Sequence, residues 1–141
     1  MLAIVYRSVA DDSFDLPEIY SMLSRAREYN TEHGITGCLL YHNSKFLQLL
    51  EGEEEKIEGL FQKISNDSRH RKVEVIEQGI LNTRLFNEWS MAFHDYGQNG
   101  QSAYIKMGQI DSFLNSSNAF KQKNPLALSF FSQVKDILFS N

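Results

Sequence analysis

The spacing of hydrophobic and polar positions changes several times over the first 95 residues of the chain. Apolar residues recur every three or four positions over residues 16–30 and 57–64, and each stretch predicts an amphipathic helix. Short apolar runs predict five strands, at residues 2–7, 35–41, 45–51, 73–80 and 89–94. The resulting order, β-α-β-β-α-β-β, predicts an α+β fold: a ferredoxin-like sandwich of one mixed sheet with both helices on one face.

Polar residues mark the ends of the two predicted helices. Asp15 is placed to cap the first helix, with Glu18 three positions later and Pro17 in the first turn, where a missing N–H does little harm. Gly34 suits the end of this helix. Three carboxylates at residues 53–55 fall at the start of the second helix, where the helix dipole favours negative charge.

Residues 96–141 have a different pattern and are expected to form a linker and a helical extension of the domain at residues 1–95. Residues 95–101 are polar and contain glycine, which is typical of a linker. Apolar residues at helical spacing predict one helix over residues 104–114 and another starting at Pro125. We expect these C-terminal helices to cover the sheet face that the first two helices leave open. Pairing with another subunit is the alternative.

Composition limits the kinds of partner. The chain has 141 residues, a formal charge of −4 and a sequence pI near 5.5, a balance that argues against nucleic-acid binding. Cys38 is the only cysteine, which fits a reducing compartment. No apolar run reaches the roughly 18–20 residues that a membrane helix needs, and the first residues lack the pattern of a signal peptide. We therefore expect a cytoplasmic protein that binds no membrane.

Three polar residues fall on otherwise apolar faces. Side chains alternate along a strand, so Tyr6 shares a face with apolar neighbours at positions 2 and 4, and Gln48 with those at 46 and 50. Asn30 continues the apolar stripe of the first helix. A phenol and two carboxamides, with no charged group among them, do not make an acid–base site, but they can bind a planar heterocycle with alternating donors and acceptors. Local hydrogen bonds to the backbone are the other interpretation.

Other kinds of site find little support in the sequence. The four histidines, at positions 33, 42, 70 and 94, lack the spacing of metal ligands, so no metal is expected. Gly34 and Gly37 lead into a strand and not into a helix, unlike a phosphate-binding loop.

Five segments resemble the BLUF family, blue-light sensors that use flavin. They are residues 4–8 (IVYRS), 29–37 (YNTEHGITG), 46–52 (FLQLLEG), 67–70 (DSRH) and 88–91 (EWSM), in the order and spacing of that family. The similarity covers about residues 1–95. It implies a noncovalently bound flavin, usually FAD although FMN is possible, between the two helices and against the sheet.

The resemblance also implies a role for each matching residue. Tyr6 would donate an electron and a proton to the excited flavin, and Gln48 would bridge the phenol to the flavin and rearrange. Cofactor contacts are expected from Tyr6, Tyr29, Asn30, Gln48, Lys63, Ile64, Asp67, Arg69 and His70. Lys63 stands where relatives often have arginine, which keeps the charge but loses the forked geometry. Trp89 and Met91 match the strand that relays the signal.

The sequence thus predicts a photoreceptor without enzymatic turnover that signals through the fifth strand and the C-terminal helices. Because no cyclase, phosphodiesterase or DNA-binding module follows residue 95, the output is expected to pass through an effector partner or a homo-oligomer interface. A light-independent flavin redox protein and a flavin-free ferredoxin-like binding module, for RNA for example, are the alternative functions. The acidic pI argues against the RNA module.

Overall fold

A computed structural model of the chain describes residues 1–13, 15–42, 44–86, 93–95 and 124–139. Its described strands form one sheet in the order β4-β1-β3-β2-β5. They are β1 (Leu2–Ala10), β2 (Thr36–His42), β3 (Lys45–Gly52), β4 (His70–Ile80) and β5 (Phe93–Asp95). β1 pairs antiparallel with both β3 and β4, β2 pairs antiparallel with β3, and β5 lies parallel to β2. The predicted mixed sheet is confirmed.

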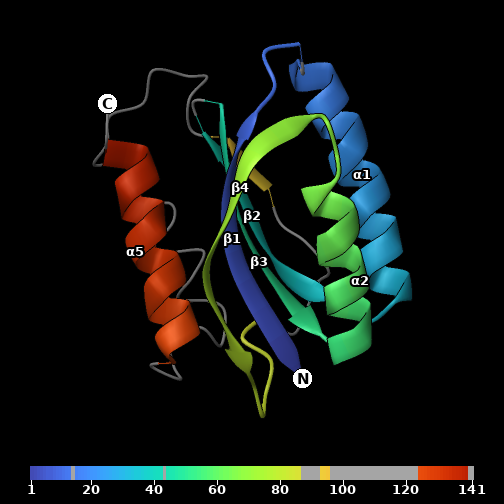
Figure 1. The fold of residues 1–141 in the computed structure, drawn as a ribbon, viewed down its shortest axis with the longest axis vertical. Helices are drawn as coiled ribbons and strands as arrows, with labels where there is room; N and C mark the ends of the chain where they lie inside the picture. Colours follow the sequence, from blue (N-terminus) through green and yellow to red (C-terminus); the bar gives the residue numbers. More distant parts are fainter. Residues whose placement is uncertain (14, 43, 87–92, 96–123, 140–141) are drawn as a thin grey trace.

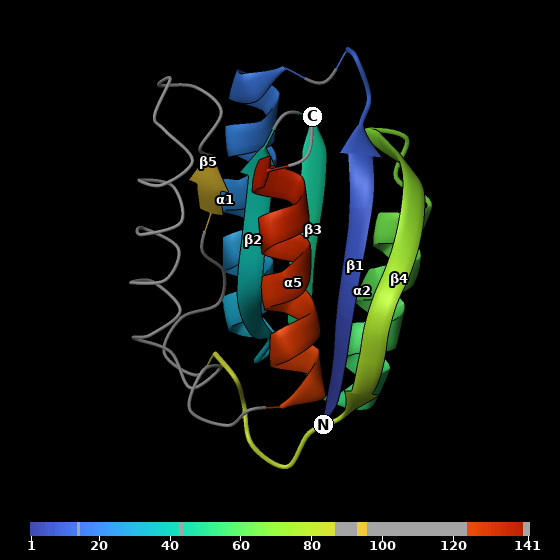
Figure 2. The same cartoon turned by 90° about the vertical axis from the view of Figure 1, so that its left-hand side faces the viewer.

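Helices cover both faces of this sheet. α1 (Leu16–Glu32) and α2 (Glu54–Ser65) lie on one face, and α5 (Pro125–Phe139) lies across the other (Figures 1 and 2). The helix predicted to begin at Pro125, and its placement on the open face, are confirmed. The helix predicted over residues 104–114 and the linker lie outside the described residues, so the domain boundary near residue 95 stays a prediction.

The ends of α1 follow the local sequence. The Asp15 side chain accepts a hydrogen bond from the Glu18 backbone N–H at 3.0 Å, which satisfies one of the free N–H groups of the first turn. The helix ends at Glu32, and Gly34 follows with φ +67°, the left-handed conformation that glycine adopts without strain. The chain then turns directly into β2.

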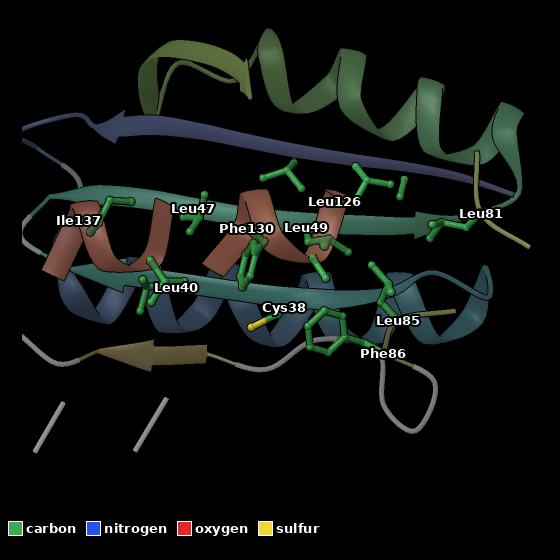
Figure 3. Packing of buried hydrophobic residues seen from close by; sticks show 14 residues of the cluster. Cys38, Leu40, Leu47, Leu49, Leu81, Leu85, Phe86, Leu126, Phe130 and Ile137 are labelled. Carbon is green, nitrogen blue, oxygen red and sulfur yellow. The ribbon is translucent and has the colours of Figure 1, made fainter. Parts of the chain in front are cut away.

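Alternation along the strands divides the apolar residues into two cores. The core between the sheet and the helices α1 and α2 contains Leu2, Ile4, Tyr6, Ile19, Phe46, Leu50 and Ile57. The core between the sheet and α5 contains Val5, Leu47, Leu49, Phe86, Phe130, Val134 and Ile137, several of which are seen in Figure 3. The central strands β1 and β3 are therefore buried on both faces, and consecutive residues of each strand belong to different cores.

Two strands extend three residues beyond their predicted ranges: β1 at its end and β4 at its start. β4 begins at His70, three residues before the predicted start, because its pairing with β1 continues to Ala10 and His70. The pattern of apolar residues does not predict the extension of β4, because the added residues are polar and lie partly exposed at the edge of the sheet. β5 matches the predicted fifth strand at residues 93 and 94 and adds Asp95, and the predicted residues 89–92 lie outside the described residues. No helix within the described ranges combines the length and the apolar character that crossing a membrane requires.

Gly37 allows β2 to approach β3 closely. A Cβ atom at this position would lie 1.8 Å from the carbonyl oxygen of Leu49, and the backbone φ is +155°. Gly59 provides a contrast in α2, because a Cβ atom there would meet nothing within 4 Å. The two glycines have opposite steric surroundings in the same protein.

We expect Gly37→Ala to lower the free energy of unfolding by about 3 kcal/mol or more, because β2 must move away from β3 to make room for the methyl group. The matched control, Gly59→Ala, should raise the free energy of unfolding by about 0.5–1 kcal/mol, because alanine favours the interior of a helix. Urea unfolding of both variants and the wild type measures the difference. Equal midpoints for Gly37→Ala and the wild type would contradict the close approach.

Candidate functional site

A cavity of about 430 Å³ lies between the sheet and the helices α1 and α2. It is lined from β1, α1, β2, β3, α2 and the turn that leads into β4. All nine residues expected to contact a cofactor line it: Tyr6, Tyr29, Asn30, Gln48, Lys63, Ile64, Asp67, Arg69 and His70. The elements predicted from the sequence pattern thus bring these residues into one place.

Tyr6 and Gln48 are joined at the wall of this cavity. They lie directly opposite each other in the pairing of β1 with β3, and the Tyr6 hydroxyl donates to Oε1 of Gln48 at 2.9 Å. Burial, together with the negative charge of Asp67, raises the pKa of the Tyr6 phenol well above its usual value. The phenol therefore keeps its proton at neutral pH and acts as the donor. This bond leaves the amide NH2 of Gln48 as a donor for another group.

Asn30 is buried with one polar atom unsatisfied. Its side chain is 2% exposed, and Oδ1 has no hydrogen-bond partner among the described residues. Its backbone carbonyl accepts from the N–H of Ile35 at 2.8 Å, so the end of α1 fixes the residue in place. An unpaired buried acceptor costs about 1–3 kcal/mol. The arrangement fits a bound molecule that brings its own hydrogen-bond donor into the cavity.

Tyr29 of α1 and Lys63 of α2 both line the cavity and contact each other. The Lys63 ammonium lies 5.5 Å from the centre of the Tyr29 ring, a cation–π distance. The other stacking partner of Tyr29 is His33, with ring centres 4.0 Å apart, and His33 Nδ1 donates to the Tyr29 carbonyl. The contact between Lys63 and Tyr29 connects α1 to α2 at the cavity.

Asp67 and Arg69 form a pair in the turn after α2. The Arg69 guanidinium donates to both carboxylate oxygens of Asp67, and the Arg69 backbone N–H also donates to Oδ1 at 2.9 Å. The bonds from Arg69 hold the pKa of the Asp67 carboxyl below its usual range, so the carboxylate stays ionised. The turn therefore presents a fixed polar edge to the cavity.

His70 connects three elements at the same edge. Its Nε2 faces the carbonyl oxygen of Ile64, which only accepts, so Nε2 carries the hydrogen. In the neutral ring, Nδ1 then accepts from the hydroxyl of Ser8 at 2.8 Å. The imidazole also lies edge-on to Phe46. Contacts with β1, β3 and the end of α2 fix the position of the ring.

The cavity is also lined by six residues for which the sequence predicted no cofactor contact: Met22, Arg25, Ala26, Leu39, Phe46 and Leu60. Helical spacing could have found some of them, since Arg25 and Met22 precede Tyr29 by four and seven positions. Trp89 and Met91, the predicted relay residues, lie outside the described residues. Within the described ranges no group of histidine, cysteine or acidic residues could hold a metal ion.

Comparison with known proteins identifies the family. A model of the family described as "Sensors of blue-light using FAD", BLUF, matches residues 1–92. The chain belongs to the BLUF family. The BLUF proteins are blue-light flavin sensors.

Individual relatives agree with this assignment. The chain is 32% identical over 95 residues to the blue light- and temperature-regulated antirepressor BluF of Escherichia coli, a match that covers 67% of this chain and 24% of the antirepressor. The photo-activated state of BlsA aligns over 99% of this chain and 96% of its own, with 28% identity and a TM-score of 0.67. Klebsiella pneumoniae BlrP1 with FMN and cyclic diGMP aligns over 99% of this chain and 35% of its own, with 27% identity and a TM-score of 0.77. The chain therefore spans about a quarter of its antirepressor relative and a third of BlrP1.

Proposed function

We propose that the cavity between the sheet and α1 and α2 is the flavin site, and that Tyr6 and Gln48 are the pair that responds to light. The observation that carries this proposal is the hydrogen bond from the Tyr6 hydroxyl to Gln48 Oε1 at the cavity wall. A neutral buried phenol hydrogen-bonded to an amide has a proton to give and an adjacent group that can accept it.

Each polar residue of the cavity has a role in this proposal. Asn30 Oδ1, unpaired in the protein, accepts from the flavin ring, and Tyr29 packs beside it. Lys63 and Ile64 contribute from α2. Asp67, Arg69 and His70 bind the polar side chain of the cofactor from the turn before β4. The pairing of Arg69 with Asp67 and of His70 with Ser8 places these groups before the cofactor binds.

A bound flavin would supply a strong oxidant when it is excited by blue light. Tyr6 would give one electron to this oxidant and pass its phenolic proton along the hydrogen bond to Oε1 of Gln48. Gln48 responds by changing its tautomer or its orientation, because a carboxamide has a donor side and an acceptor side that can be exchanged. Electron and proton return to Tyr6, so nothing is consumed. Gln48 remains in its second arrangement, which is a change of hydrogen bonds with no enzymatic turnover.

We propose FAD as the cofactor, with FMN as the alternative. The family description names FAD, whereas the BlrP1 structure is a complex with FMN. Arg25, Lys63 and Arg69 line the cavity and supply positive charge that suits the phosphate groups of either cofactor. Mass spectrometry of the cofactor released from purified protein distinguishes the two.

The signal passes, in this proposal, through Trp89, Met91 and the fifth strand to the C-terminal helices and then to an effector partner or a second copy of the chain. α5 supports this route, because it packs on the sheet face opposite the cavity and contacts β1 and β3. The relatives place the domain beside different outputs, an antirepressor and an adenylate cyclase among them.

The buried, unpaired thiol of Cys38 is consistent with the cytoplasm.

We expect purified protein to be yellow and to show a small red shift in its visible spectrum under blue light that reverses in the dark. Tyr6→Phe should keep the flavin and lose the red shift, because it removes the proton and the electron donor. The control is Tyr41→Phe, which removes a hydroxyl outside the cavity lining. A normal red shift in Tyr6→Phe would show that Tyr6 is not the donor. Oxidation of a reduced nicotinamide by the wild type without light would instead indicate a redox enzyme.

Gln48→Leu should also abolish the red shift, since leucine has no amide to rearrange. Gln78→Leu places the same substitution on the exposed part of β4 and should respond like the wild type. The visible spectrum before and after illumination measures both variants. A response of wild-type size in Gln48→Leu would refute the role of the amide.

Asn30→Ala should weaken flavin binding by roughly 5- to 100-fold, because the cofactor loses a buried hydrogen bond worth about 1–3 kcal/mol. Asn82→Ala, at an exposed position, serves as the control. Titration of flavin into protein stripped of its cofactor measures both affinities. Equal affinities for Asn30→Ala and the wild type would exclude Asn30 from the cofactor site.

A further inference from the structure

One buried charged residue has no part in the cavity. Glu51 has 0% exposed surface, and of the residues that the structure describes it is the one charged side chain among the buried groups. It lies on β3 three positions after Gln48, and alternation along the strand turns it to the opposite face of the sheet. The strand that carries Gln48 therefore also carries a carboxylate on the α5 side.

Three donors of the protein hold the Glu51 carboxylate. The backbone N–H of Phe86 donates to Oε1 at 2.7 Å, and the backbone N–H of Leu85 donates to Oε2 at 2.9 Å. The hydroxyl of Thr36, its neighbour on β2, donates to Oε1 at 2.9 Å. Burial raises the pKa of the Glu51 carboxyl above its usual value, although these three bonds and the nearby Arg84 act in the opposite direction. A carboxylate accepts all three hydrogen bonds, so the ionised form matches its surroundings.

Arg84 binds the neighbours of Glu51 at the start of β2. Its guanidinium donates to the Thr36 hydroxyl at 2.9 Å and to the carbonyl oxygen of Gly34 at 2.7 Å. Thr36 thus accepts from Arg84 and donates to Glu51. The side chains of Glu51, Thr36 and Arg84 thus bind residues 84–86 to β3 and to the start of β2.

The segment that Glu51 holds packs against α5 and precedes β5 along the chain. Leu85 and Phe86 belong to the connection from β4 to β5, and both side chains are buried in the core beneath α5 (Figure 3). The Phe86 ring lies edge-on to Phe130 of α5, with ring centres 6.3 Å apart. Glu51 is therefore connected to α5 through one hydrogen-bonded backbone segment and one aromatic contact.

A second contact joins the central strands to α5, and it is more exposed. Arg7, next to Tyr6 on β1, donates to Gln133 at 2.7 Å and pairs with Asp136 at 3.0 Å. The Asp136 side chain is 56% exposed, so water competes for this ion pair. Loss of one partner matters more for a buried, hydrogen-bonded carboxylate such as Glu51 than for an exposed pair.

We propose that Glu51 is a positioning residue that ties β3, the strand of Gln48, to the segment leading into β5 and α5, and so transmits the light response across the sheet. This inference rests on the proposed function, because it needs a rearrangement at Gln48 to transmit. A shift of β3 moves a carboxylate whose partners are backbone N–H groups, and these follow it. The coupling is thus carried by hydrogen bonds with defined partners on both sides.

The test compares Glu51→Gln with the wild type in the full 141-residue chain loaded with flavin. Glutamine keeps the size of the side chain but loses the charge and one of the two acceptor oxygens. Glu55→Gln makes the same change at an exposed position of α2 and is the matched control. Two quantities are measured in darkness and under blue light: the visible spectrum, and hydrogen exchange of peptides covering residues 81–86 and 125–139.

In the wild type and Glu55→Gln, light should change the exchange of both peptides. Glu51→Gln should keep the full red shift of the flavin while the difference between light and dark exchange over residues 125–139 falls at least twofold. A purely structural role would alter dark and light exchange equally and leave this difference intact. An undiminished difference in Glu51→Gln would therefore overturn the inference, as would a red-shifting wild type without any change in α5.

Failure of the proposed function gives a separate result, since the wild type itself would then lack the red shift. If Glu51→Gln does not fold, Thr36→Val replaces it. That variant removes one donor to the carboxylate and leaves both backbone N–H groups in place. It should reduce the light-dependent change in α5 with the red shift preserved, and an unchanged response would overturn the inference.

Discussion

The hydrogen bond between Tyr6 and Gln48 depends on the register of two strands. β1 and β3 are neighbours with no direct connection along the chain, and their pairing sets the phenol opposite the amide. Helices α1 and α2 then enclose the pair, and this burial raises the pKa of the phenol above its usual value. Asn30, the paired Asp67 and Arg69, and His70 complete the wall around this central bond. The photochemistry proposed for the site requires all of these to be in place before light arrives.

Much of the site could be predicted because it follows from periodicity. Two-residue alternation placed Tyr6 and Gln48 on one face of the sheet, and helical spacing added Asn30. Alternation along each strand could not show that Tyr6 and Gln48 lie directly opposite each other, because the register of two strands depends on long-range pairing. Asp67, Arg69 and His70 follow no period, and it was the resemblance to the BLUF family that favoured a cofactor role for them over an ordinary polar turn.

Glu51 shows what the sequence could not reveal. A glutamate at the end of an apolar strand is usually exposed, and the pattern offered no reason to expect burial. Its partners are the backbone N–H groups of Leu85 and Phe86, more than 30 positions away. Almost every residue type has a backbone N–H, so the sequence does not indicate which ones bind a side chain. The extra stretch of pairing that begins β4 at His70 was missed for a similar reason, since it depends on β1 and not on the apolar pattern of β4.

Burial of β1 and β3 on both faces has a consequence for how this sequence can change. A single inserted residue in β1 before position 6 would rotate the following side chains by half a turn about the strand. The Arg7 guanidinium would then turn to the cavity side, and the Tyr6 ring would point at α5. Most side chains of both strands are buried, so neither strand has a solvent-exposed face that could absorb such an error, and we expect insertions and deletions to be tolerated better outside these two strands.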